Sequence, residues 1–151
     1  MNAADTDKAV LDYLKSIGVT ATTQYGGETV RDGKWECDAW RVQFVRVSTT
    51  TAPRKEMSTE FFTGFGHRRR SPGIKLPQPV APSPASVLYS LLSDARGAES
   101  NFYDWCNGYG YDSDSRKALA VYDACCLTLR DIRQFFTPAD RDALEVLLEG
   151  Y

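Results

Sequence analysis

The fold class is decided by residues 35–45, which read WECDAWRVQFV. In this stretch Trp40, Val42 and Phe44 alternate with Arg41 and Gln43, so the two sets lie on opposite faces of an extended chain. A two-residue period of this kind predicts a β-strand with one apolar face that another layer must cover.

Further strand signals lie on either side of this stretch. Residues 57–62 place Met57, Thr59 and Phe61 on one face of a second strand. Two glycine-containing pairs, Gly26-Gly27 and Asp32-Gly33, are typical of turns. We therefore expect a three-stranded antiparallel meander within about residues 22–63.

Helical periodicity dominates the rest of the chain. Residues 5–17 carry apolar side chains at helical spacing and are followed by Gly18. Residues 84–149 predict three or four helices: one after the Ser83-Pro84 start signal, a short one at 101–107, a long one at 115–136, and one after Thr137-Pro138. Between sheet and helices, residues 64–84 are rich in proline and predict an extended crossing loop.

These signals combine into one fold prediction. We expect an α+β fold with a small antiparallel three-stranded sheet, an N-terminal helix, and a C-terminal group of three to four helices packed on one face. The 151 residues match the usual size of one domain, and a chain of this length buries roughly 70% of its unfolded surface. We therefore expect residues 1–151 to form a single domain.

Composition excludes several classes of protein. The apolar fraction of 42% and the charged fraction of 25% are ordinary for globular proteins. No run approaches the length of a membrane span, and the first residues lack a basic segment followed by an apolar one, so we expect a cytoplasmic protein without membrane contact. The net charge of −2 is unevenly spread: residues 1–93 hold 12 Lys/Arg and 9 Asp/Glu, and residues 94–151 hold 6 and 11. This imbalance is too small for a dedicated DNA binder or DNA mimic.

The cysteines and the single histidine argue against metal and redox chemistry. The four cysteines are Cys37, Cys106 and the adjacent pair Cys125 and Cys126, all in apolar or aromatic surroundings. We expect reduced, buried thiols and no zinc site, because there is one histidine and no C-x-x-C pair. No nucleophile and base can be paired from spacing, so we expect a protein that is not an enzyme and needs no cofactor.

Residues 112–116 open like a calcium loop, with Asp112 and Asp114 two apart. Arg116 occupies the position of the third ligand, and neither the glycine nor the final glutamate of such a loop follows. We instead expect Asp112 or Ser113 to cap the long helix, with Asp114 in its first turn.

An aromatic group precedes this segment and has two interpretations. Its rings could stack on nucleic-acid bases, but the nearby charges are carboxylates, which repel phosphate. We expect the rings to pack the helices onto the sheet. The group comprises Phe102, Tyr103, Trp105, Tyr109 and Tyr111.

The candidate binding site is a basic loop. Gly64 and Gly66 flank Phe65, and His67, Arg68, Arg69 and Arg70 follow at once, with Lys75 close behind. Glycines permit close backbone approach, and guanidinium groups bind carboxylate or phosphate with two donors. The spacing does not match a P-loop, and prolines follow instead of a helix. A solvated loop, a protein contact and a nucleic-acid contact all remain open for these residues.

The order of four motifs resembles a family of small uncharacterised phage and prophage proteins. The motifs are W-x-x-D-x-W-x-V-x-F from Trp35 to Phe44, STEFFTGFGHR from Ser58 to Arg68, VLYSLLSDA from Val87 to Ala95, and F-x-DWC-x-x-x-GYDSDSRKA from Phe102 to Ala118. The resemblance covers about residues 30–130; it implies a phage setting and identifies no site residues. Phage proteins of this size often inhibit bacterial defence systems, including CRISPR-Cas complexes, so an anti-defence role follows by analogy.

Taken together, the sequence predicts a non-enzymatic phage-type effector in the cytoplasm of a bacterial host. The expected partner is a host protein or ribonucleoprotein complex, contacted through His67, Arg68, Arg69, Arg70 and Lys75. The alternative is a nucleic-acid-binding accessory protein of phage replication or recombination that uses the same arginines. The sequence leaves the oligomeric state open.

Overall fold

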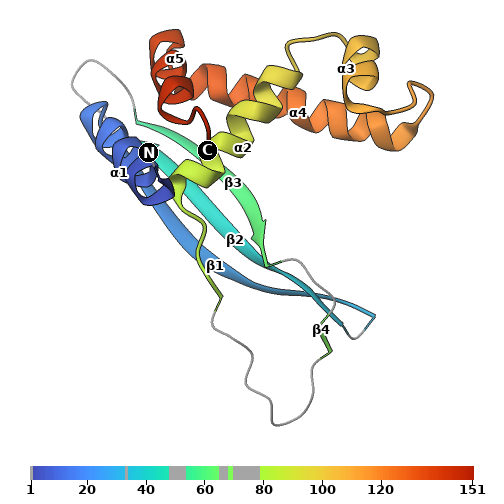
Figure 1. Ribbon diagram of the computed structural model, residues 1–151, viewed down its shortest axis with the longest axis horizontal. Coiled ribbons are helices and arrows are strands. Elements are labelled where there is room, and N and C mark those ends of the chain that lie inside the picture. Colours follow the sequence, from blue (N-terminus) through green and yellow to red (C-terminus); the bar gives the residue numbers. More distant parts are fainter. Residues whose placement is uncertain (1, 33, 48–53, 65–67, 70–78) are drawn as a thin grey trace.

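The chain folds as an N-terminal helix, an antiparallel sheet and four C-terminal helices, which confirms the predicted α+β class (Figure 1). The computed structural model describes residues 2–32, 34–47, 54–64, 68–69 and 79–151, and only the backbone of residues 31, 34, 35, 68 and 69. Helix α1 (Ala3–Ser16) comes first, and helices α2 (Pro84–Gly97), α3 (Phe102–Tyr109), α4 (Arg116–Phe135) and α5 (Pro138–Leu147) follow the sheet.

The sheet is a meander whose central strand is the predicted apolar stretch. Strand β1 (Val19–Arg31) pairs along the whole of β2 (Lys34–Arg46), and β3 (Lys55–Thr63) pairs with the half of β2 from Asp38 to Arg46. The loop predicted at 64–84 contains an additional two-residue strand, β4 (Arg68–Arg69), which pairs with the opposite half of β2 at Lys34 and Trp35. The β1–β2 hairpin extends well beyond the helices (Figure 1).

The turn predicted at Gly26-Gly27 is wrong. These glycines lie inside β1, where the register with β2 shifts between Tyr25 and Gly27 and forms a bulge. Gly27 has φ +107°, a backbone conformation that residues with a side chain rarely adopt. Glycine permits both a turn and a bulge, and here it forms a bulge. The chain reverses between Arg31 and Lys34, which pair with each other, at the position of the other predicted turn.

The helix starts follow local capping signals. The predicted caps Ser83 and Thr137 are confirmed, and both are followed by a proline in the first turn. The cap predicted for the long helix is wrong: the Ser115 hydroxyl accepts the hydrogen bond from the Ala118 amide, at 3.3 Å. The Asp112 carboxylate instead accepts from the Asp114 amide, at 3.0 Å, and shapes the preceding turn.

The main core lies between the helices and the inner face of the sheet. Phe44 and Val42 from β2 are fully buried there, together with Val10 of α1, Leu88 of α2 and Ile132 of α4. The alternation of apolar and polar residues in β2 therefore arises as predicted, because the helices cover the apolar face of the strand. Within the described ranges, no helix is both long and apolar enough to cross a bilayer.

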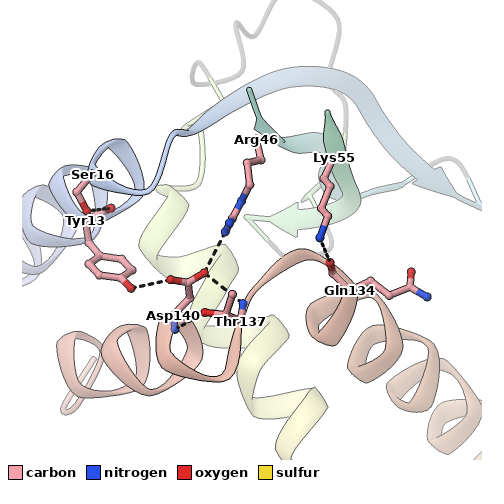
Figure 2. A network of polar contacts seen from close by, with 7 residues as sticks. All are labelled: Tyr13, Ser16, Arg46, Lys55, Gln134, Thr137 and Asp140. Carbon is pink, nitrogen blue, oxygen red and sulfur yellow. Dashed lines mark hydrogen bonds and ion pairs between the residues drawn. The ribbon is translucent and has the colours of Figure 1, made fainter. Parts of the chain in front are cut away.

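A buried carboxylate joins three elements at the end of this core (Figure 2). Asp140 of α5 accepts hydrogen bonds from the Tyr13 hydroxyl of α1 and from the Arg46 guanidinium of β2, each at 3.0 Å. The backbone amide of Thr137 donates to the same carboxylate, and the Asp140 amide donates to the Thr137 hydroxyl, which closes a capping box. One side chain thus ties α1, β2 and α5 together.

The network keeps Asp140 ionised. Burial by itself raises the pKa of this carboxyl, but the hydrogen bonds from Arg46, Thr137 and Tyr13 favour the carboxylate and hold the pKa below its usual 3.8. Burial, together with the neighbouring Asp140 charge, raises the pKa of Tyr13 and keeps its hydroxyl a donor. The contribution of Asp140 to the free energy of unfolding is therefore full above pH 3.8 and is lost as the pH falls through the lower pKa of the folded state.

We predict that Asp140→Asn lowers the free energy of unfolding at neutral pH by about 2–3 kcal/mol, because it leaves the Arg46 charge without its partner. The difference from the wild type should shrink as the pH falls below 3.8. Urea unfolding curves at neutral and acid pH measure both effects.

Asp142→Asn is the matched control, since Asp142 is exposed on the same helix. It should change the free energy of unfolding by less than about 0.5 kcal/mol. Equal effects of the two variants, or an Asp140 effect that persists unchanged in acid, would contradict the role of the network.

Candidate partner-binding surface

The structure describes only part of the predicted basic site. His67, Arg70 and Lys75 lie outside the described residues. Arg68 and Arg69 form β4, and their backbone pairs with Trp35 and Lys34 near the β1–β2 turn. This strand lies at the end of the hairpin that is remote from α3 (Figure 1). A contact through these arginines stays a prediction.

A second surface of the described chain has the features of a binding site, and we call it the aromatic tip. It consists of residues 99–123, which include α3, the turns on both sides of it and the first half of α4, and it lies at the end of the helical layer away from the sheet (Figure 1). Its rings belong to Phe102, Tyr103, Trp105, Tyr109, Tyr111 and Tyr122.

Trp105 organises the rings of the tip. Its side chain is 4% exposed, and the Tyr111 ring stacks on it with centroids 4.9 Å apart and an interplanar angle of 9°. Tyr109 and Tyr122 each lie 5.4 Å from Trp105, and the Tyr122 hydroxyl donates to the Ser100 carbonyl at 2.6 Å. Trp105, Cys106 and Ala118 form a small core that is separate from the main one.

The interpretation that these rings pack the helices onto the sheet is therefore wrong: they pack α3 on α4 and against the end of α2 at Gly97. The sequence shows that the rings are apolar but cannot show which layer covers them. Packing also does not account for all five rings, because Tyr103, Tyr109 and Tyr111 are exposed.

Local sequence explains the shape of the tip. The Asn101 side chain caps α3 by accepting from the Asp104 amide at 2.8 Å. Gly110 ends the helix at φ +75°, and the Tyr111 amide then donates back to the Cys106 carbonyl at 2.9 Å. Gly97 gives the rings room, because a Cβ at this position would lie 2.9 Å from the Tyr109 hydroxyl oxygen.

The outer surface of the tip is aromatic and acidic. The exposed fraction is 64% for Tyr103 and 59% for Tyr109, and Tyr111 and Leu119 are also exposed. Residues 99–123 carry five carboxylates and two cations. Such a surface attracts Lys and Arg side chains through charge and cation–π contacts and repels phosphate. The carboxylates are Glu99, Asp104, Asp112, Asp114 and Asp123.

A groove adjoins the tip between α2 and α5, with a volume of about 470 Å³. Leu92 and Leu148 form its apolar floor, and an ion pair at 2.9 Å joins Arg96 to Glu145. Arg96 precedes Gly97, so the groove reaches the point where Tyr109 packs. The groove also has an acidic rim, formed by Asp142, Glu145 and Glu149.

The cysteine thiols are mostly buried. All four cysteines are free; Cys126 is half-buried and the other three are buried. Burial is the main cause that raises the pKa of the Cys106 and Cys125 thiols, and nearby carboxylates raise it further. Both groups therefore remain protonated and weakly nucleophilic at neutral pH.

Among the described residues, no three His, Cys, Asp or Glu side chains gather closely enough to hold a metal ion. Comparisons of the chain with protein-family models, with curated proteins and with solved structures give no match. The resemblance to small phage proteins therefore stays a prediction, and the geometry of the described surface supplies the argument for function.

We predict that Trp105→Ala unfolds the aromatic tip without unfolding the main core, because the two cores are separate. Hydrogen exchange measured by mass spectrometry should show faster exchange of the α3 amides and of the turn at 110–115. The amides of β2 and β3 should keep their wild-type protection.

Phe44→Ala serves as the comparison, since Phe44 is fully buried in the main core. It should lower protection throughout the sheet and the helices packed on it. Loss of sheet protection in Trp105→Ala as large as that in Phe44→Ala would contradict the separation of the two cores.

Proposed function

We propose that this chain is a non-enzymatic effector that binds a protein surface in a bacterial host and thereby inhibits that protein, with the aromatic tip as a principal contact. The observation that supports this proposal is the set of three exposed tyrosines flanked by carboxylates: Tyr109 and Tyr111 pack on the buried Trp105, and Tyr103 lies on the same helix as Trp105.

Preorganisation makes such a surface effective. Tyrosine buries a large area with little loss of conformational freedom, and aromatic residues dominate the energetics of protein interfaces. The stacked Tyr111 and the neighbouring Tyr109 are already fixed by Trp105, so little further ordering is needed when a partner arrives.

Charge favours a protein over a nucleic acid at this surface. The five carboxylates of the tip repel phosphate groups and complement lysine and arginine on a protein. The proposed partner therefore presents a basic patch with which the tyrosines make cation–π contacts.

The phage setting comes from the resemblance of the four sequence motifs. On that basis the proposed partner is a component of a bacterial defence system, such as a CRISPR-Cas complex, and the proposed location is the host cytoplasm. Nucleic-acid-binding subunits of such complexes carry basic surfaces, and a basic surface complements the negative charge of the tip.

The second candidate function is nucleic-acid binding through Arg68, Arg69 and Arg70. One observation favours it: β4 lies at the far end of the hairpin from the acidic tip, so the carboxylates of the tip do not oppose a phosphate there (Figure 1). Three arginines and Lys75 neutralise about three or four phosphates, which gives a slope of log affinity against log salt of roughly −2 to −4.

We predict that replacing Tyr103, Tyr109 and Tyr111 together by alanine weakens binding to the host partner at least tenfold, or about 1.4 kcal/mol, because the aromatic contacts are lost. Capture from nuclease-treated bacterial lysate identifies the partner, and titration with the purified partner measures the affinity. The control is Leu11→Ala combined with Val80→Ala, which removes two exposed apolar side chains elsewhere. It should bind like the wild type.

The same measurement separates the two candidate functions. Replacing Arg68, Arg69 and Arg70 by alanine should leave partner capture from nuclease-treated lysate within about threefold of wild type if the tip is the contact. Submicromolar binding of DNA or RNA at about 0.15 M salt by the wild type, abolished in the arginine variant, would replace our proposal with the alternative.

A further inference from the structure

The two edges of the sheet differ in how they are protected. The strand order places β1 at one edge and β3 at the other, and among the described residues β1 pairs only with β2. On β1, Thr20, Thr22, Thr23 and Gln24 are exposed even though α1 contacts the same strand. The exposed residues Thr20 and Thr22–Tyr25 therefore lie at an edge of the sheet that no described strand covers, next to the buried Val19.

Charged side chains protect the β3 edge, whereas the first part of β1 has none. Strand β3 carries Lys55, Glu56 and Glu60 within nine residues, and the Lys55 ammonium donates to the Gln134 carbonyl at the end of α4, at 3.2 Å. Strand β1 has no charged residue and no proline from Val19 to Gly27. Natural edge strands are usually protected by charge, proline or a bulge, and here the bulge comes only after Tyr25.

We propose that Val19–Tyr25 pairs antiparallel with the same segment of a second copy of this chain, about a two-fold axis at Thr22. This register places Thr22 opposite Thr22, Thr20 opposite Gln24, and Val19 opposite Tyr25. The two side chains of each pair then lie on the same face of the joined sheet, because the paired residues are an even number of positions apart along the strand.

The cross-strand pairs favour a second copy as the occupant. Threonine pairs and an aromatic side chain opposite a β-branched one are favourable neighbours across antiparallel strands. Tyr25 is already fixed, because its ring lies 4.9 Å from that of Trp40 and its hydroxyl donates to Asp38 at 2.9 Å. Because the segment carries no charge, two copies meet there without opposing like charges, although each chain has a net charge of −2.

The joined sheet leaves the aromatic tip accessible. Helix α3 packs on α4 and against the end of α2 at Gly97, and it lies away from β1 (Figure 1). A dimer formed through β1 thus presents two copies of the tip, and its formation is independent of any partner bound there.

The register supplies a matched pair of variants for the test. Thr22, Gln43 and Ser58 form one row across the three strands, and Thr22 and Ser58 are exposed at opposite edges. Thr22→Lys sets two lysines opposite each other at the two-fold axis, whereas Ser58→Lys adds the same charge to the edge that is already charged. Sedimentation velocity at protein concentrations from about 5 to 500 µM covers the dissociation constants expected of a dimer with a small interface.

We expect the wild type and Ser58→Lys to reach twice the chain mass as concentration rises, and Thr22→Lys to raise the dissociation constant at least tenfold. A wild type that remains monomeric overturns the proposal, as does a Thr22→Lys variant that dimerises like the wild type. Equal loss of dimer in both lysine variants also overturns it.

If Thr22→Lys fails to fold, hydrogen exchange of the wild type tests the proposed dimer. The amides of Thr20–Gln24 should exchange more slowly at high than at low protein concentration, while those of β3 should show no such dependence. Concentration-independent exchange in β1 would overturn the proposal. Neither measurement involves the host partner, so each outcome is separate from the fate of the proposed function.

Discussion

The fold depends on one buried carboxylate at the meeting point of three elements. Asp140 receives hydrogen bonds from Tyr13 of α1, from Arg46 of β2 and from Thr137 at the start of its own helix (Figure 2). Removing one partner from such a group leaves a buried polar atom or charge unsatisfied. The free-energy cost of that unsatisfied group is larger than the net stabilisation from one hydrogen bond. The network therefore fixes where α5 and α1 sit on the sheet, and the apolar side chains of the main core fill the space between them.

This arrangement also determines what the helical layer exposes. With α5 held at Arg46, the long helix α4 extends past the sheet and carries α3 at its far end (Figure 1). The rings of the tip have no sheet to cover them and form a second small core around Trp105, which leaves tyrosines in solvent beside five carboxylates. The predicted basic residues of the loop lie in the other part of the sequence, where Lys and Arg outnumber Asp and Glu.

The features that the sequence predicted correctly are local ones. Alternation in residues 40–44 and the Thr137-Pro138 start signal depend on neighbouring residues, and the structure confirms both. The Arg46–Asp140 contact joins residues 94 positions apart, and no local pattern could reveal it. Gly26-Gly27 forms a bulge in place of the predicted turn, because glycine permits a bulge as readily as a turn. The aromatic group was recognised, but periodicity identifies apolar side chains without showing which of them lose contact with the sheet. The basic loop stays a prediction, because His67, Arg70 and Lys75 fall outside the described residues.

The most direct test of the account places a photo-crosslinking amino acid at one of two positions. At Tyr103 it probes the aromatic tip, and at Arg69 it probes the end of the hairpin where β4 pairs with β2. We expect a nuclease-resistant adduct with one host protein from position 103 after irradiation in bacterial cells, and no comparable adduct from position 69. A nuclease-sensitive adduct from position 69, with none from position 103, would contradict the claim that the acidic aromatic tip binds a protein.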